Sequence, residues 1–224
     1  NIHSGRIASD NTSYGCNAGR AITTGTNNAL IGEGAGYNLT LSDDNVALGH
    51  NALYGYMSSN VGSNNIAIGW DAMFYTTDKS SNVAIGKSAL SLPPGGTIEE
   101  TVAIGHYSDK MSGVTPTKSV AIGARTKIGA ENSTAIGFRA QASQANSMVL
   151  GSINGVNSAT ANTDVAIGTT TPNARLQVGG GGFGIGNDNA ISSTHGQRRS
   201  IQIASDVNYG GGLDNHSGYL IYSI

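Results

Sequence analysis

The sequence predicts an all-β fold, a parallel β-solenoid of short stacked coils, from three observations. A pentapeptide of alternating large and small apolar residues that ends in glycine recurs along the chain in eight copies, preceded by two looser ones. Successive copies begin only 14 to 20 residues apart. Glycine accounts for 33 of the 224 residues, about twice the roughly 7% that is usual in proteins. A chain with these properties turns tightly, often and at regular intervals.

The repeated pentapeptide is clearest in the middle of the chain, for example in Asn45-Val46-Ala47-Leu48-Gly49. Side chains alternate between the two faces of a strand, so the large residues at the second and fourth positions share one face and the small third residue lies on the other. A glycine at every corner is expected if that position needs a positive φ or has no room for a Cβ. The ten corner glycines are Gly15, Gly32, Gly49, Gly69, Gly86, Gly105, Gly123, Gly137, Gly151 and Gly168.

A second short apolar segment follows several corners at a constant offset, as in Asn51-Ala52-Leu53, Asp71-Ala72-Met73 and Ser88-Ala89-Leu90. Each unit is therefore expected to be a strand, a glycine corner, a second strand and a variable loop. Such a unit is too short for a βαβ crossover, which needs about 30 residues. It fits one solenoid coil, with coils stacked about 4.8 Å apart and the differences in length confined to the loops.

The core of a single roll is predicted to be thin. One coil contributes only three or four large aliphatic side chains, whose burial at about 25 cal/mol per Å² must offset roughly 1 to 2 kcal/mol of backbone entropy per ordered residue. We therefore expect several rolls to associate around a common axis. The stripe of small alanines at the third position is expected to let the chains approach closely.

The C-terminal part of the chain changes character after a run of four glycines at 179–182. Alternating segments at 200–204 and 218–222 predict strands joined by a glycine-rich loop. We divide the chain into a repeat shaft (1–172), a Gly-rich connector (173–183) and a small β tip domain (184–224). About 40 residues need oligomerisation to be stable.

The tip carries side chains suited to recognising a sugar or a protein. The alternative interpretation is that the tyrosines pack in its core and the arginines form a solvated patch. The candidate receptor-binding residues are Arg198, Arg199, Tyr209, Asp214, Asn215, His216 and Tyr219.

Composition and charge exclude several classes of function. A net charge of -2 gives no basic stripe for nucleic acid. No apolar run approaches the roughly 18 to 20 residues of a membrane span. The five histidines are scattered rather than placed at metal-ligand spacing, so we predict no metal and no cofactor.

Catalysis is also not expected. Hydrolysis of polysaccharide needs two carboxylates about 5 to 9.5 Å apart, and the acidic pairs of this chain are Asp43-Asp44 and Glu99-Glu100. Both pairs fall in variable loops, and adjacent residues on an extended chain point to opposite faces. No Gly-x-Ser-x-Gly nucleophile elbow occurs. We predict that the protein is not an enzyme.

One aromatic cluster stands out in the repeat region. It is expected either to form a lateral binding patch or to pack within loops or between chains. Its members are Trp70, Phe74 and Tyr75, with Tyr54, Tyr56 and Met57 one coil earlier.

The repeats from about Ser13 to Pro172 resemble the head repeats of trimeric autotransporter adhesins of the YadA-like kind, and very similar repeats occur in phage tail fibres. The resemblance implies a left-handed parallel β-roll of about ten coils, homotrimeric about a threefold axis, with a role in attachment. Residues 166–178 resemble the segment that joins the shaft of a phage tail fibre to its distal domain. A trimer would triplicate any residue near the axis, so an ion on the axis stays an open alternative.

We therefore expect a non-catalytic, receptor-binding phage tail-fibre protein that is extracellular on the virion and mediates host-surface recognition and attachment. Its expected partners are two further copies of itself, a glycan or protein receptor on the host cell surface, and other tail or baseplate proteins. A bacterial cell-surface adhesin head and a purely structural filament or spacer are the alternatives. Units of 17 to 20 residues favour the fibre over the compact 14-residue adhesin head.

Overall fold

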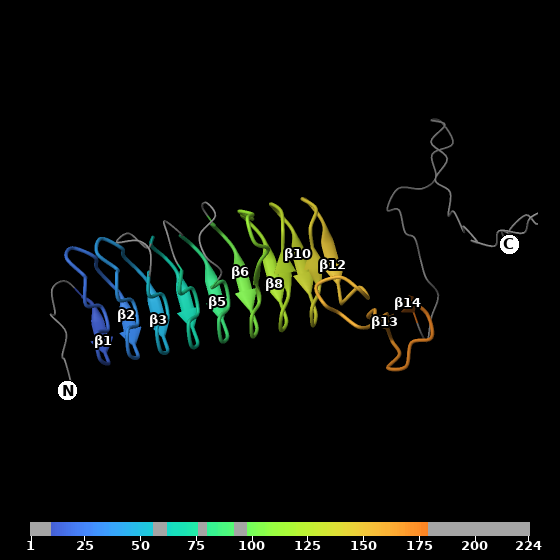
Figure 1. The fold of residues 1–224 in the computed structure, drawn as a ribbon, viewed down its shortest axis with the longest axis horizontal. Coiled ribbons are helices and arrows are strands. Elements are labelled where there is room, and N and C mark those ends of the chain that lie inside the picture. The colour runs from blue at the N-terminus through green and yellow to red at the C-terminus, as the bar shows by residue number, and fades with distance from the viewer. Residues whose placement is uncertain (1–9, 56–61, 76–79, 92–97, 179–224) are drawn as a thin grey trace, which may run out of the picture. The chain divides into compact units, whose positions relative to one another are not determined.

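The computed structural model describes residues 10–55, 62–75, 80–91 and 98–178. The chain divides into two compact units, Asn1–Gly182 and Phe183–Ile224, and all described residues belong to the first. This part of the chain is an all-β parallel β-solenoid, as the sequence predicts (Figure 1).

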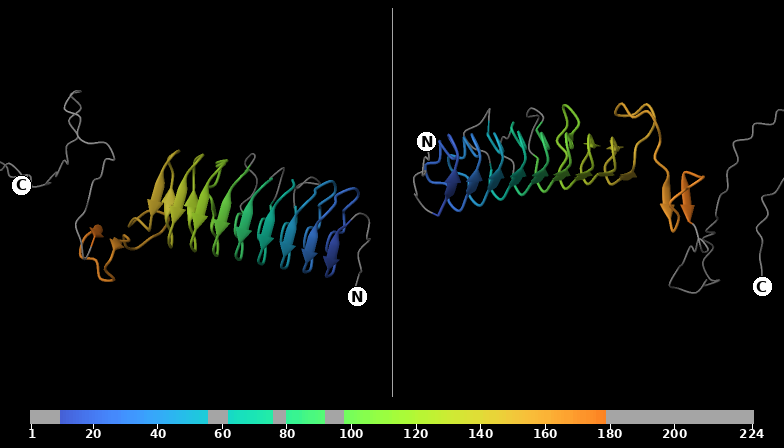
Figure 2. Two further views of the ribbon diagram at one scale, coloured as in Figure 1. Left: turned by 180° about the vertical axis from the view of Figure 1, so that it is seen from behind. Right: turned by 90° about the horizontal axis from the view of Figure 1, so that it is seen from below.

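Nine three-residue strands stack in chain order into one parallel sheet (Figures 1 and 2). Each strand is the middle of one predicted pentapeptide, and the register joins equivalent positions, as in Ala47 opposite Ala67. The nine strands are β1 (Thr12–Tyr14), β2 (Ala29–Ile31), β3 (Val46–Leu48), β4 (Ile66–Ile68), β5 (Val83–Ile85), β6 (Val102–Ile104), β8 (Val120–Ile122), β10 (Thr134–Ile136) and β12 (Met148–Leu150).

The second strand of each unit is present only in later coils. There β7 (Asp109–Lys110), β9 (Lys127–Ile128) and β11 (Gln141–Ala142) form a small parallel sheet. The second strands predicted at 51–53, 71–73 and 88–90 are wrong, because those residues form turns in which the first and third residues have φ between 51° and 54°. A backbone that alternates between negative and left-handed φ is not extended.

The corner glycines are required for both of the predicted reasons. In the first seven corners φ lies between 127° and 133°, a region that L side chains rarely adopt. A Cβ built on Gly69 would lie 2.6 Å from the carbonyl oxygen of Gly86 in the next coil. The glycine column therefore fixes how closely successive coils stack.

The alanine face of the sheet lies inside the roll. Ala47, Ala67 and Ala84 have no exposed surface, and they pack in one cluster with buried Leu53, Met73, Leu90 and similar residues from the turns after the corners. The expectation that the alanine stripe would let chains approach is wrong, because the alanines face their own core. The turn side chains opposite them fill the thin interior and leave room for only a methyl group.

A ladder of buried asparagines runs along the stack at the residue before each strand. Asn28, Asn45, Asn65 and Asn82 are each at most 1% exposed. The Nδ2 of Asn65 donates to Oδ1 of Asn45 at 3.1 Å, and its backbone N–H donates to the same oxygen at 3.0 Å. Later coils replace the amide with hydroxyls, beginning at Thr101, whose N–H donates to Oδ1 of Asn82 at 3.0 Å. The ladder explains why each pentapeptide begins with a polar residue, directly before its strand.

The stack contains fewer coils than the ten predicted. The last repeat forms β13 (Val165–Ile167), which pairs with β14 (Leu176–Val178) and not with β12. The loop between β12 and β13 folds back on the last corner, where the Thr163 side chain occupies the space that a Cβ on Gly151 would take. Gly168, with φ of 75°, therefore lies outside the glycine column.

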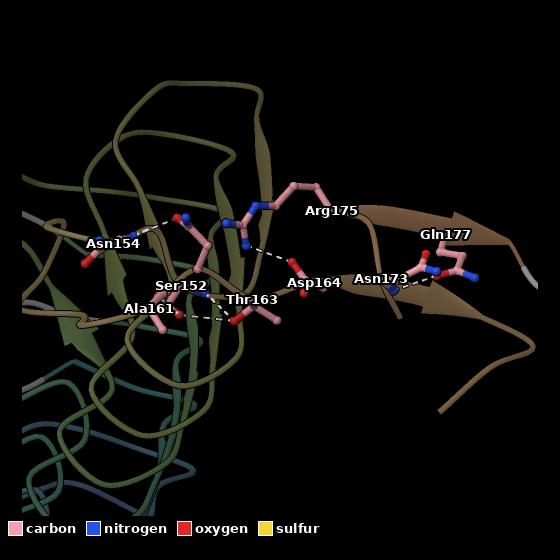
Figure 3. A network of polar contacts seen from close by, with 9 residues as sticks. Ser152, Asn154, Ala161, Thr163, Asp164, Asn173, Arg175 and Gln177 are labelled. Atoms are coloured by element: carbon pink, nitrogen blue, oxygen red, sulfur yellow. Dashed lines mark hydrogen bonds and ion pairs between the residues drawn. The ribbon is translucent and has the colours of Figure 1, made fainter. Parts of the chain in front are cut away.

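Polar contacts hold this loop and the β13–β14 pair (Figure 3). The backbone N–H of Ser152 donates to Oγ1 of Thr163 at 2.9 Å, and the N–H of Thr163 donates to the Ser152 carbonyl at 2.9 Å. Arg175 Nη1 lies 2.7 Å from Oδ1 of Asp164. The first two bonds hold the loop beside the last corner, and the ion pair joins the residue before β13 to the residue before β14.

Candidate functional site

The outward side of the nine-stranded sheet is a continuous aliphatic surface, which we call the aliphatic face. Two columns of side chains form it, from the second and fourth positions of each repeat, in strands β2 to β12. The first column is Ala29, Val46, Ile66, Val83, Val102, Val120, Thr134 and Met148, and the second is Ile31, Leu48, Ile68, Ile85, Ile104, Ile122, Ile136 and Leu150.

Side chains of the aliphatic face are exposed or half-buried in the single chain. Exposed fractions reach 44% for Ile31 and Leu48 and 64% for Met148. Large apolar patches are rare on soluble monomers and mark sites where another surface binds. The regular register makes this patch straight and rigid, so it offers a preformed surface for association.

Exposed polar and aromatic residues border the aliphatic face, because the residue after each corner glycine lies beside it. In the middle coils this position holds His50, Trp70 and Lys87. The Lys87 ammonium lies 4.5 Å from the centre of the Trp70 ring, and the His50 ring meets Trp70 edge-on at 5.9 Å. Trp70 is thus held between its neighbours in the column.

The predicted aromatic cluster divides in two. Tyr54 and Phe74 join Tyr37 in a stack of rings five residues after successive corners, with centroids 4.7 and 5.1 Å apart, and Tyr75 meets Phe74 edge-on at 4.9 Å. Trp70 belongs instead to the border column, and Tyr56 and Met57 lie outside the described residues. Stacking uses the ring faces of Tyr54, which favours packing over a binding patch.

The acidic pair Asp43-Asp44 also serves the stack. Oδ1 of Asp43 accepts hydrogen bonds from the backbone N–H of Thr26 at 2.7 Å and from its hydroxyl at 3.0 Å. Oδ1 of Asp44 accepts from the side chain of Asn27 at 3.2 Å. The two carboxylates therefore link different residues of the preceding coil.

A pocket lined by cations was missed by sequence reasoning. It has a volume of about 280 Å³ and lies where the turns of three coils meet the loop after β12. Its signal in the sequence is the second residue after the corner, which changes from small polar residues in early coils to Tyr107, Arg125 and Arg139.

The seven candidate receptor-binding residues of the tip, from Arg198 to Tyr219, lie outside the described residues. Within the described ranges, no group of three or more His, Cys, Asp or Glu side chains is placed to hold a metal ion. The same ranges contain no helix long and apolar enough to cross a membrane. No protein-family model matches the chain, and no curated protein matches it either.

Proposed function

We propose that this protein is a homotrimeric, non-catalytic phage tail fibre that mediates attachment to a host surface. In this proposal, residues 1–172 form a rigid shaft and residues 184–224 carry the receptor-binding tip. The observation that carries the proposal is the aliphatic face, a straight apolar surface exposed on a regular stack of coils.

The spacing of the aliphatic face selects its partner. Its side chains repeat once per coil, at about 4.8 Å, and a surface with the same repeat is needed to bury all of them at once. A second copy of this chain, rotated about an axis parallel to the stack, brings every coil level with its equivalent. Closed rotational symmetry of this kind is the usual arrangement of homo-oligomers.

Three chains are proposed because the repeats resemble those of trimeric adhesin heads and tail fibres. Each aliphatic face would then be covered by two neighbouring chains. The border column of His50, Trp70 and Lys87 would lie at the solvent-exposed rim of the interface between chains. The left-handed sense of the β-roll belongs to the same proposal. Attachment, and no chemistry, is the function that this arrangement supports best.

The trimer is tested by substituting a residue of the aliphatic face. Leu48→Asp is expected to abolish the trimer, because it would bury three ionised carboxylates near the axis, each at a cost of several kcal/mol. Light scattering of the wild-type protein should give three times the chain mass of 22.7 kDa, and the variant should give monomer or aggregate.

Leu41→Asp is the matched control, because Leu41 is 58% exposed but lies in a loop off the sheet. It should leave the trimer intact. A wild-type protein that is a folded monomer at micromolar concentration would overturn the trimeric assembly, and a variant trimer as stable as the wild type would remove the aliphatic face from the interface.

Attachment is tested by deleting residues 183–224. The shortened chain should keep the trimeric mass, because the aliphatic face lies within residues 29–150, but it should no longer bind the bacterial cells that the fluorescently labelled full chain binds. Undiminished binding would place recognition on the shaft. A full chain that binds no cell type tested would favour the structural spacer.

A further inference from the structure

The cationic pocket brings together residues from four segments that are far apart in the sequence. Tyr107, Arg125 and Arg139 follow the corners after β6, β8 and β10, and Lys127 lies in β9. Asn157 and Ser158 come from the loop after β12 and complete the lining. Three of the six lining residues are cationic.

Stacking fixes the two arginines in adjacent coils. Strands β8 and β10 pair with Ile122 opposite Ile136, so Arg125 and Arg139, each three residues further on, occupy equivalent positions one coil apart. Their backbone N–H groups donate to His106 and Ala124 of the preceding coils at 2.8 and 2.9 Å. Like charges at one coil spacing repel, and an anion between or beside them offsets this repulsion.

The loop after β12 is tied to both arginines. Nδ2 of Asn157 donates to the carbonyl oxygen of Arg125 at 2.6 Å and to that of Arg139 at 3.3 Å. These bonds hold one wall of the pocket against the coils. The lining is therefore built by the fold rather than by chance proximity of surface side chains.

Within the described residues Arg125, Lys127 and Arg139 form no ion pair, although Arg139 stacks on the Phe138 ring at 5.1 Å and Asp109 is the register partner of Lys127. The Lys and Arg residues that form ion pairs there are Lys118 and Arg175, neither of which lines the pocket. The Nε of Arg139 is buried and makes no hydrogen bond in this part of the chain. The pocket favours an anionic ligand because three cations line it and none of them forms an ion pair in this part of the chain.

The residue types in the pocket depart from the pattern of the fold. The second residue after each corner has a left-handed backbone, which small polar residues and glycine tolerate best. Tyr107, Arg125 and Arg139 nevertheless adopt it, with φ of 54°, 58° and 58°. Earlier coils carry Asn17, Gly34, Asn51, Asp71 and Ser88 at this position.

We propose that this pocket binds an acidic sugar, that is, a monosaccharide unit bearing a carboxylate, phosphate or sulfate group. Arg125, Lys127 and Arg139 would hold the anionic group, and Tyr107, Asn157 and Ser158 would contact the ring and its hydroxyls. A volume of about 280 Å³ is close to the lower end of the roughly 300 to 1,000 Å³ of small-molecule sites, which suits a sugar rather than a bare ion. This inference depends on the pocket alone and not on the fibre assembly.

The test is binding of D-glucuronate, glucose 6-phosphate and glucose 6-sulfate to the full chain, measured by ligand-observed NMR and calorimetry. Dissociation constants are expected at about 0.1 to 10 mM, a range typical of single weak sites, for at least one of the three sugars. Neutral glucose should not bind. Inorganic phosphate and sulfate should bind at least threefold more weakly than the corresponding sugar.

The double variant Arg125→Asn, Arg139→Asn should raise the dissociation constant of the sugar at least tenfold. Asparagine is the residue of early coils at this position, so the variant keeps a backbone that the fold accepts. Lys118→Asn is the matched control, because Lys118 also has a left-handed backbone, with φ of 54°, and Asn132 follows it in the equivalent place of the next coil. The control should bind as the wild type does.

No binding of any acidic sugar at about 50 mM would overturn the proposal, since a dissociation constant above that value corresponds to less than roughly 2 kcal/mol of binding free energy. Equal binding by the double variant and the wild type would overturn the assignment to this pocket. If inorganic anions bind as tightly as the sugars, the assignment of a sugar ligand is wrong and the pocket is a simple anion site. A trimeric chain that binds no acidic sugar rejects this site without affecting the proposed assembly.

Discussion

Gly86→Ala is expected to lower the free energy of unfolding by about 2 to 5 kcal/mol, since overpacking costs about 1 to 3 kcal/mol and a disallowed backbone region a similar amount. A Cβ on Gly86 would lie 2.7 Å from both the carbonyl carbon and the carbonyl oxygen of Gly105. These are backbone atoms of the next coil, which move only if the stack opens. Contacts between neighbouring coils carry the stability of a solenoid. A clash between the coils of Gly86 and Gly105 therefore weakens the connection between the coils before it and the coils after it.

The measurement is thermal unfolding followed by circular dichroism, with an expected fall in Tm of roughly 5 °C or more. Gly155→Ala is the control, because Gly155 also has a positive φ, 82°, but a Cβ there meets nothing within 4 Å. It should cost only the backbone penalty of about 1 to 2 kcal/mol. Equal losses for the two variants would show that coil spacing is not what requires the corner glycine.

Asn65→Ala is expected to cost about 2 to 5 kcal/mol, because it leaves two buried donors of Asn82 without their acceptor, at roughly 1 to 3 kcal/mol each. Oδ1 of Asn65 accepts the backbone N–H of Asn82 at 3.1 Å and its Nδ2 at 3.2 Å. Water has little access, since both asparagines are fully buried. Denaturant unfolding should show a lower midpoint with an unchanged slope.

Asn65→Ser serves as the matched variant, because the later coils use hydroxyls at the same position. Oγ of Ser119 accepts the backbone N–H of Ser133 at 3.1 Å. The serine variant should therefore recover part of the loss by accepting the N–H of Asn82. If serine and alanine destabilise equally, the ladder contributes through packing and not through its hydrogen bonds.

The strands of the main sheet could be predicted from the sequence because each strand is specified by local sequence features. The polar residue before the strand, the alternation within it and the corner glycine all recur, and each has a local physical cause in the structure. Asn45 to Gly49 is such a unit from end to end. Nine of the ten predicted segments stack as expected.

Which face of the strands lies inside could not be predicted from alternation alone. A period of two separates Ala47 from Val46 and Leu48, but it does not say which set meets the core. The alanine face lies inside because Leu53 and Met73 pack against it from turns that contain left-handed residues. Strand and helix propensities do not reveal such turns. The sequence pattern predicts a strand for these turns, and a strand there would not place large side chains against the alanines.

The last repeat shows the limit of local pattern. Residues 164–168 carry the full pentapeptide, yet β13 pairs with β14, because the loop that precedes it already occupies the end of the stack. A repeat stacks only if the previous coil is free to receive it. The cationic pocket was missed for a related reason, since it forms only when three coils and this loop meet.

The same loop has a consequence for how the molecule meets other copies of itself. A parallel sheet that ends in an open strand offers unpaired N–H and C=O groups to any passing chain, and uncontrolled growth follows from such an edge. Thr163 bonds to Ser152 beside the last strand and stands over Gly151. The loop therefore occupies the corner on which the first coil of a second molecule would have to stack, and so it opposes end-to-end growth.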